Sequence, residues 1–194
     1  MGLPIILASA SPRRMELLKQ VGVEAKVIVS DIKEQIDPGI KAEELVQKLA
    51  LGKAKAVGNV VSRGLIIGAD TVVVKEEKIL GKPRDYNDAV AMLQLLNGTE
   101  HSVITGLALV EQPSGKTITD YEKTKVFFRL LSQEEINAYV SSGEPFDKAG
   151  GYGIQEKGAL LVDRIVGDYF NVVGLPLQRL NYMMKTWNIN LLLF

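Results

Sequence analysis

Apolar runs and amphipathic stretches alternate over the first third of the chain. Residues 3–8, 25–29 and 65–69 are short and mostly apolar, which predicts buried strands. Residues 12–21 and 42–57 carry apolar side chains at helical spacing with charged ones between them, which predicts helices that pack one face on a core. Strands that alternate with helices in this way favour an α/β fold.

Strands pair directly in the middle of the chain. Residues 72–75 and 78–80 flank a two-residue turn and predict a hairpin, and the long strands 101–110 and 117–130 predict a partly exposed antiparallel ribbon. The other expected elements are helices at 85–96 and 132–140, an irregular glycine-rich segment at 143–157, segments at 159–165 and 169–173, and a helix at 176–185. The expected fold is α/β, with a mixed twisted sheet flanked by helices.

Local signals mark several helix ends. Ser11 precedes Pro12 and is expected to be an N-cap, because proline is tolerated at the first helical position. Asp85 is expected to cap the helix at 85–96. Ser132 and Glu135 have the spacing of a capping box.

The 194 residues suffice for one domain, or for two small lobes that share one folding unit and leave a cleft between them. Residues 1–194 are therefore taken as a single domain, since no linker or repeat interrupts them. The chain has 23 lysines and arginines together and 23 aspartates and glutamates together, so it lacks the net positive charge that attracts DNA or RNA. A small phosphorylated ligand suits this neutrality better.

The absence of cysteine excludes disulfides, thiolate metal sites and cysteine nucleophiles. It fits a reducing cytoplasm. No segment approaches the ~20 apolar residues of a membrane span, and no basic region precedes the short N-terminal apolar run as a signal peptide requires. We therefore expect a cytoplasmic protein with no membrane partner.

A turn rich in hydroxyl and guanidinium groups joins the first strand to the first helix. It reads Ser9-Ala10-Ser11-Pro12-Arg13-Arg14, and the N–H groups of a helix N-terminus suit a phosphate. A helix cap followed by two solvated arginines explains the same residues equally well. Arginine in a first turn opposes the helix dipole, which hints at an anion.

Two further charged residues stand in constrained places. Asp70 follows the apolar strand 65–69, where α/β sheets present ligand-binding groups, and could hold Mg²⁺ or accept a proton from water; an aspartate that merely begins a turn is the alternative. Lys82 lies between Gly81 and Pro83 and could neutralise a phosphate. Lys53, on the helix at 42–57, fits a solvated helix face.

The glycine-rich segment 147–155 is too flexible in composition for a helix and too polar for a core strand. A ligand-contacting loop is one interpretation, with Tyr152 or Gln155 meeting a base, and a plain surface loop is the other. The chain has no Walker loop. Its single histidine, His101, favours a structural role, so hydrolysis through a metal and carboxylates fits better than a serine triad. Glu34 could add a second carboxylate for Mg²⁺, although a solvated loop residue explains it too.

Four blocks together resemble the Maf family of nucleoside triphosphate pyrophosphatases, and their order and spacing match over nearly the whole chain. The blocks are Ser9 to Arg14, Gly68-Ala69-Asp70-Thr71, Gly81-Lys82-Pro83, and Asp147-Lys148-Ala149-Gly150-Gly151-Tyr152-Gly153-Ile154-Gln155. Thr71 and Gln155 resemble the subgroup that acts on dTTP and UTP. One departure is Glu156, where members of the family usually have glycine.

The resemblance implies cleavage between the α- and β-phosphates to give a nucleoside monophosphate and pyrophosphate, with a divalent cation, Mg²⁺ or Mn²⁺, as cofactor. It also implies an inosine triphosphatase-like fold and allows a homodimer. The implied roles are proton acceptor and metal ligand for Asp70, metal ligand for Glu34, substrate specificity for Arg13, Thr71 and Gln155, and phosphate contact for Ser9, Arg14, Lys53 and Lys82.

A different function keeps the same pocket. Members of this family have been linked to arrest of cell division, so a nucleotide-binding regulator that acts through protein partners is the alternative hypothesis. The zero net charge disfavours a third, a nucleic-acid-binding protein. Modified pyrimidine nucleotides are further candidate substrates. The sequence does not determine the preferred nucleotide among dTTP, UTP and these modified forms, nor the metal stoichiometry, oligomeric state or cellular role.

Overall fold

The computed structural model describes residues 3–30 and 39–193. Its contacts divide the chain into two compact units. Unit 1 comprises Met1–Asp70, Thr105–Glu122 and Gly174–Phe194, and unit 2 comprises Thr71–Ile104 and Lys123–Val173. Three long strands each contribute residues to both units: β3 (Gly64–Lys75), β5 (Glu100–Gln112) and β6 (Thr117–Phe128).

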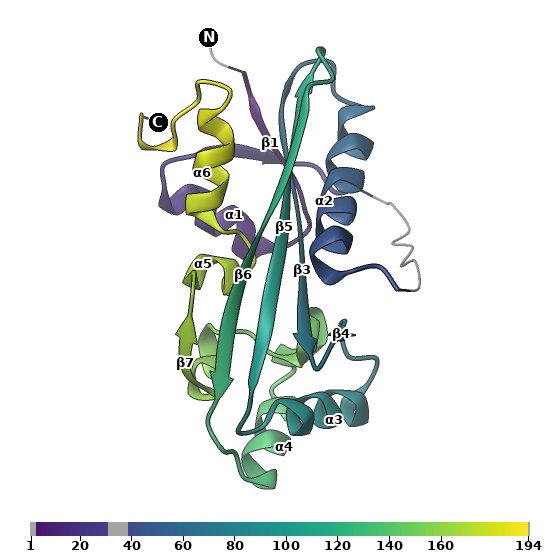
Figure 1. Cartoon of the computed structure of the whole chain (residues 1–194), viewed down its shortest axis with the longest axis vertical. Coiled ribbons are helices and arrows are strands. Elements are labelled where there is room, and N and C mark those ends of the chain that lie inside the picture. The colour runs from purple at the N-terminus through teal and green to yellow at the C-terminus, as the bar shows by residue number, and fades with distance from the viewer. Residues whose placement is uncertain (1–2, 31–38, 194) are drawn as a thin grey trace. The chain divides into compact units, whose positions relative to one another are not determined.

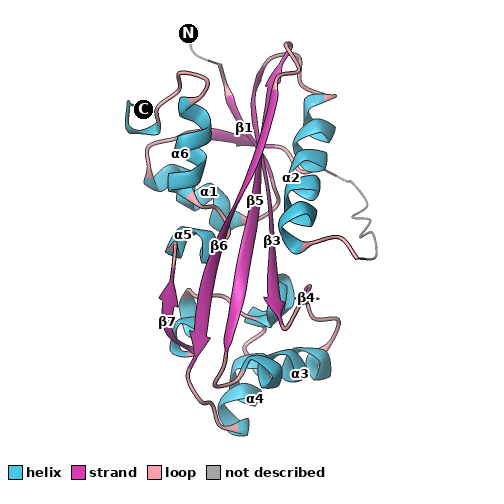
Figure 2. Ribbon diagram, in the orientation of Figure 1, coloured by secondary structure: helices cyan, strands magenta, loops and turns pink. Residues whose placement is uncertain are grey.

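The strands form one mixed sheet, which confirms the α/β prediction (Figures 1 and 2). Its order is β2-β1-β3-β5-β6-β7, with β4 paired to β3. β1 runs parallel to both β2 and β3, whereas β4 and β7 are antiparallel to their neighbours. The remaining strands are β1 (Ile5–Ala8), β2 (Ala25–Val27), β4 (Lys78–Leu80) and β7 (Val162–Val166).

Helices flank the sheet in both units. Unit 1 contains α1 (Pro12–Gln20), α2 (Ala42–Gly58) and α6 (Leu177–Lys185), and unit 2 contains α3 (Tyr86–Leu96), α4 (Gln133–Ser141) and α5 (Tyr169–Val173). Short 3₁₀ turns occupy Glu144–Asp147, Ala149–Gly151, Glu156–Leu160 and Leu191–Leu193. Among the described residues, no helix has both the length and the apolarity needed to cross a membrane.

Two glycines allow α2 to lie directly on the sheet in unit 1. A Cβ on Gly68 of β3 would stand 2.1 Å from the carbonyl oxygen of Ala50, and one on Gly106 of β5 would stand 2.3 Å from the carbonyl carbon of Val46. Real Cβ atoms essentially never approach within 3.0 Å of such atoms. The helix therefore contacts the strand backbones themselves, as its position along β3 in Figure 1 indicates.

Unit 2 has its own core, in which α3 packs against α4. Apolar side chains of these helices and of β5 and β6 form one buried cluster, which includes Leu93, Val126 and Ile136. Both predicted helix starts are confirmed: Asp85 accepts a hydrogen bond from the Asp88 N–H, and Ser132 and Glu135 form the capping box. These starts depend on neighbouring residues alone.

Three sequence interpretations differ from the structure. Residues 65–69 and 72–75 belong to one continuous strand, β3, because its first half pairs with β1 and its last residues pair with β4. The stretch expected as irregular at 143–157 is largely a series of 3₁₀ turns. Ser11 stands at the N-cap of α1, but its side chain makes no capping hydrogen bond.

Candidate functional site

The turn after β1 is built around the hydroxyl of Ser9. The Ser9 side chain is buried, and its Oγ accepts hydrogen bonds from the backbone N–H of Ser11 (3.2 Å) and from Nη1 of Arg14 (3.0 Å). Ser9 therefore holds the N-cap residue of α1 by its backbone N–H. It follows Ala8, whose Cα pairs with that of Gly68 in the last step of the β1–β3 ladder.

Arg14 fastens this turn to two other segments of unit 1. Its Nε donates to the carbonyl oxygen of Gly174 at 2.7 Å, and its Nη1 donates to the carbonyl oxygen of Ala69 at 2.9 Å. The guanidinium is thus bound by two main-chain oxygens and one hydroxyl oxygen. It lies against the residue that precedes Asp70.

Asp70 forms a close ion pair with Lys53. The Lys53 Nζ lies 2.5 Å from Asp70 Oδ1, and the two side chains are only 16% and 11% exposed. Asp70 lies two residues beyond Gly68 on β3, so both project to the face that α2 covers. The close approach at Gly68 therefore brings Lys53 to Asp70. Gly68 thus admits the backbone of α2 to the strand.

Four of the predicted site residues are thereby gathered in unit 1. Arg14 binds Ser9 and the carbonyl oxygen of Ala69, the residue before Asp70, and Lys53 pairs with Asp70 itself. Arg13 precedes Arg14 in the same helical turn and is partly buried. The cluster combines two cations, one hydroxyl and one carboxylate, which is a composition suited to phosphate oxygens and a proton transfer.

Asp70 does not stand at a strand end as the sequence suggested. β3 continues through it to Lys75, and the sheet edge that opens beside it is the end of β1 at Ala8. The strand that stops is therefore the neighbour. In α/β sheets, ligands bind where a strand ends. Asp70 lies beside the end of β1, so its side chain is still in a place suited to a ligand.

The other predicted site residues belong to unit 2. Thr71 is partly buried on β3, Lys82 is exposed after β4, and Gln155 is partly buried before the 3₁₀ turn Glu156–Leu160. Gly150 connects two of these segments, since its N–H donates to the carbonyl oxygen of Gly81 at 2.9 Å. Glu34 lies outside the described residues.

Comparison with known proteins places this chain in a family. The sequence pattern described as Maf-like protein matches residues 4–187. The chain belongs to the Maf family. Three curated relatives carry the name dTTP/UTP pyrophosphatase: those of Acetivibrio thermocellus, 51% identical over 97% of both chains; Desulforamulus reducens, 46% identical over 97% of this chain and 98% of the other; and Bacillus cereus, 50% identical over 96% of both.

A solved structure, that of the Staphylococcus aureus Ham1 protein, aligns with this Maf-family chain at a TM-score of 0.46 and 14% identity. The alignment covers 64% of this chain and 71% of that one.

Glu156, the residue that departs from the resemblance, has a left-handed backbone conformation. Its φ is +54°, in the left-handed region that side chains disfavour. The Glu156 side chain is exposed.

Tyr152 of this Maf loop does not reach outward to a base as one interpretation proposed. It is 4% exposed, and its hydroxyl lies 2.5 Å from Nε2 of His101. His101 is equally buried. Burial, with a smaller effect of the Lys75 charge, lowers the pKa of His101 from 6.5 to about 4. The expectation of a structural histidine agrees with this environment.

The side chains described in this Maf chain include no group of three or more His, Asp or Glu residues close enough to hold a metal ion. Asp70 offers a single carboxylate. Mg²⁺ often binds through one or two carboxylates and completes its shell with waters and substrate phosphates, so Asp70 fits that donor set.

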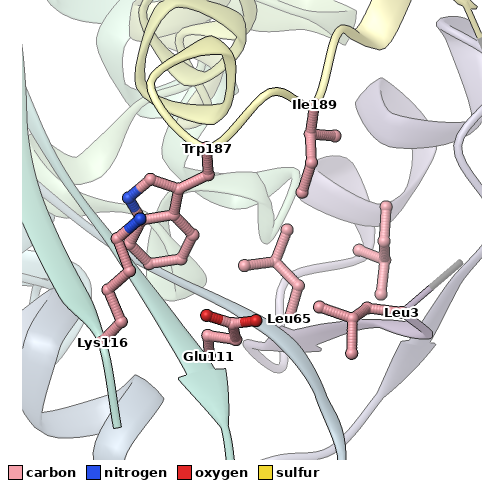
Figure 3. Close-up of a pocket in the computed structure, with 7 residues that line it drawn as sticks. Leu3, Leu65, Glu111, Lys116, Trp187 and Ile189 are labelled. Atoms are coloured by element: carbon pink, nitrogen blue, oxygen red, sulfur yellow. The ribbon is translucent and has the colours of Figure 1, made fainter. Parts of the chain in front are cut away.

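A pocket of about 400 Å³ lies elsewhere in unit 1 and contains none of the predicted site residues (Figure 3). The Lys116 Nζ is 4.7 Å from the centroid of the Trp187 ring, and Glu111 completes the polar part of the lining. Aliphatic side chains form the rest: Leu3, Ile5, Leu65 and Ile189.

Proposed function

We propose that this chain hydrolyses dTTP and UTP to the nucleoside monophosphate and pyrophosphate. The observation that carries the proposal is the buried Lys53–Asp70 ion pair. Arg14 holds Ser9 close to this pair, because it binds both the Ser9 hydroxyl and the carbonyl oxygen of Ala69. The names of the three curated relatives support the same activity.

Cations and hydroxyls of this chain would bind the phosphate groups. Negative phosphate oxygens repel an attacking water until cations neutralise them. We assign this role to Arg14 and Lys53, with Ser9 as a hydrogen-bond donor and Lys82 as a further cation. The ammonium of Lys53 has three N–H donors, so it can serve a phosphate oxygen while it still holds Asp70.

Asp70 would take the proton from the attacking water. Its carboxylate is oriented by Lys53, and only 8% of the residue is exposed, so competing bulk water has little access to it. A positioned base of this kind contributes roughly 10²- to 10⁴-fold to a rate. A divalent cation, Mg²⁺ or Mn²⁺, would be held by Asp70 together with the phosphates, and Glu34 is the second candidate ligand. Such a cation supplies neutralising charge.

Base selection is assigned to Arg13, Thr71 and Gln155. Hydrogen-bonding groups aimed at a base discriminate strongly, because a wrong base leaves them without partners. The amide of Gln155 can both donate and accept, which suits the O4 and N3–H edge shared by thymine and uracil.

A nucleotide panel tests the proposed activity directly. Purified chain is incubated with dTTP, UTP, CTP or GTP and Mg²⁺, and both pyrophosphate and orthophosphate are measured. We expect pyrophosphate from dTTP and UTP and much less from the other two. Release of orthophosphate alone would contradict cleavage between the α- and β-phosphates. Binding of dTTP without any product would instead favour the nucleotide-binding regulator, which no described feature of the site and none of the three relatives' names supports.

Asp70→Asn tests the proton acceptor. We expect kcat to fall by roughly 10²-fold or more, because the amide keeps the shape and loses the basicity. Asp163→Asn is the matched control, since Asp163 lies exposed on β7 and pairs with its neighbour Arg164 in a surface contact at 3.1 Å. Turnover by Asp70→Asn equal to that of the control would exclude the assignment.

Lys53→Met tests the cation beside Asp70. Lys55 lies two residues along the same helix and is exposed, so Lys55→Met makes the same chemical change outside the cluster. We expect a loss of about 10-fold or more in kcat/KM for Lys53→Met, the scale of one charged hydrogen bond, and near-normal values for Lys55→Met. Equal effects of the two substitutions would remove Lys53 from the site.

The assignments of partners are tested separately. We propose a homodimer without affinity for nucleic acid in a cytoplasmic setting, on the family resemblance and the zero net charge. A sedimentation mass equal to that of one chain would contradict the homodimer. Retention on a DNA column at physiological salt would contradict the lack of affinity for nucleic acid.

A further inference from the structure

A buried polar contact stands behind the glycine-rich loop in unit 2. The His101 Nε2 and the Tyr152 hydroxyl are 2.5 Å apart, and each residue is 4% exposed. Their rings meet edge to face with centroids 5.3 Å apart, and Phe128 packs edge-on against both at 5.1 and 4.7 Å. This aromatic trio is enclosed by the apolar cluster of the unit.

The contact leaves one polar atom without a partner. His101 Nδ1 is buried and makes no hydrogen bond within the described part of the chain, whichever ring nitrogen carries the proton. Burial disfavours the charged form of each ring and so lowers the pKa of His101 and raises that of Tyr152. Two phenylalanines would fill the same space with no orphaned atom. Packing alone therefore does not account for a histidine here, whereas a directional bond to Tyr152 does.

Tyr152 is the side-chain anchor of a backbone that glycine makes otherwise flexible. It stands between Gly151 and Gly153, and Gly150 and Gly151 have φ values of +69° and +71°. A Cβ on Gly150 would stand 2.8 Å from the Val73 side chain, so the loop also needs glycine to fit against β3. Because glycine leaves the backbone flexible, the buried Tyr152 side chain fixes the position of this segment.

The anchored segment reaches two residues assigned to the nucleotide. Gln155 follows Tyr152 by three residues, and the Gly150 N–H donates to the carbonyl oxygen of Gly81, the neighbour of Lys82. The Gly153 N–H donates to the Tyr139 hydroxyl at 3.2 Å, which supports the loop from α4. A shift of Tyr152 would therefore be passed along the main chain toward both Gln155 and Lys82.

We propose that His101 is a positioning residue for substrate recognition: through its hydrogen bond to Tyr152 it sets the place of residues 150–155 and hence of the Gln155 amide. This inference rests on the proposed function, because it takes Gln155 as a base-recognising residue. His101 itself touches no reacting atom.

The test uses the double variant His101→Phe with Tyr152→Phe in the full chain. Each single substitution leaves a buried polar group unpaired, whereas the double variant removes both and keeps ring-shaped side chains. We expect each single variant to lower the Tm and the double variant to return it to within a few degrees of the original. If the bond positions the loop, the double variant still raises KM for dTTP about 10-fold, with kcat within about 3-fold.

Amide hydrogen exchange of residues 150–155 in nucleotide-free protein is the second readout. We expect about 10-fold faster exchange in the double variant, since the loop loses its directional anchor. This measurement needs no substrate, so it separates failure of the inference from failure of the proposed function. An original chain that releases no pyrophosphate would contradict only the latter.

Two further variants complete the design. Thr124→Val breaks another buried network of unit 2, in which Thr124 Oγ1 accepts from the Asn171 side chain at 2.9 Å. It should lower the Tm and leave KM unchanged. His101→Gln places an amide near the position of Nε2 and should restore KM to within about 3-fold. Unchanged KM and unchanged exchange in the double variant would overturn the inference. If the double variant does not regain its Tm, Tyr152→Phe alone, assayed well below its Tm, decides by the same two readouts.

Discussion

Gly68→Ala tests whether the spacing between α2 and β3 determines catalysis. The added Cβ would stand 2.1 Å from the Ala50 carbonyl oxygen and 3.0 Å from the Ala54 Cβ, whereas ordinary van der Waals contact begins at 3.4 Å. The first contact is too close by more than 1 Å; its partner is a backbone oxygen, and the second partner is a Cβ fixed directly to the backbone of α2. Neither can rotate away, so α2 must move off the strand by about 1 Å.

Lys53 lies between Ala50 and Ala54 in sequence and moves with them. A displacement of about 1 Å in a positioned group can cost about 10²-fold in rate, so we expect a kcat loss of that order for dTTP. Overpacking should also cost about 1–3 kcal/mol of folding free energy. For a chain of this size each kcal/mol lowers the Tm by about 2–4 °C, and the variant remains folded at 25 °C.

The assay is pyrophosphate release at 25 °C with thermal melts on the same samples. A double-mutant cycle with Lys53→Met isolates the cause. If the alanine acts by displacing Lys53, it should add little to the loss when Lys53 is already methionine. Gly106→Ala is the control, because it strains α2 at Val46, two turns from Lys53. It should lower the Tm as much as Gly68→Ala does but lower kcat less. Two results would refute the reasoning. One is a Gly68→Ala variant that has a lowered Tm but a normal kcat, and the other is a Gly68→Ala substitution that lowers kcat as much in the Lys53→Met background as in the original chain.

The remaining predictions concern unit 2. The pKa of His101 is about 4 in the folded chain and 6.5 when unfolded, so the unfolded chain binds more protons between these values and stability falls as the pH drops below 6.5. At pH 5 the free energy of unfolding should be about 2 kcal/mol lower than at pH 7.5, which lowers the Tm. The double variant His101→Phe with Tyr152→Phe should not show this fall in Tm. Parallel plots of Tm against pH for the two proteins would contradict the prediction. Glu156→Gly relieves a left-handed residue and should raise the Tm by a few degrees at most, because about 1–2 kcal/mol of strain is partly offset by about 0.5–1 kcal/mol of added chain entropy. Lys157→Gly, the neighbouring control, should lower the Tm, and a fall in both variants would argue against strain at Glu156.

Features that depend on adjacent residues could be predicted from the sequence. The Asp85 cap and the Ser132–Glu135 capping box need only a side chain and an N–H three residues away, and both are present. The hairpin at Glu76-Glu77 is present as well, with φ values of +49° and +66° that suit a two-residue turn. The mixed sheet followed from the same local alternation of elements.

Features that depend on distant residues could not be predicted. Nothing near Asp70 shows that β3 continues through it, because the continuation depends on pairing with β1 before it and with β4 after it. The partner of Asp70 lies seventeen residues away on a helix whose charged face resembled a solvated one. Tyr152 likewise resembled a ligand contact in a glycine loop until its partner, 51 residues earlier, was placed beside it.

The glycines of this chain show why those distant contacts are specific. Gly68 admits the backbone of α2, and its substitution would separate Lys53 from Asp70 without altering either side chain. Gly150 admits the side chain of Val73, and its substitution would lift the loop that Tyr152 anchors. In both units, therefore, the charged or hydrogen-bonding residues provide the chemistry, and an adjacent residue without a side chain determines the distance at which they act. A chain that kept every proposed site residue but replaced these two glycines should consequently bind and cleave dTTP poorly, and kinetic analysis of Gly68→Ala and Gly150→Ala would show the first mainly in kcat and the second mainly in KM.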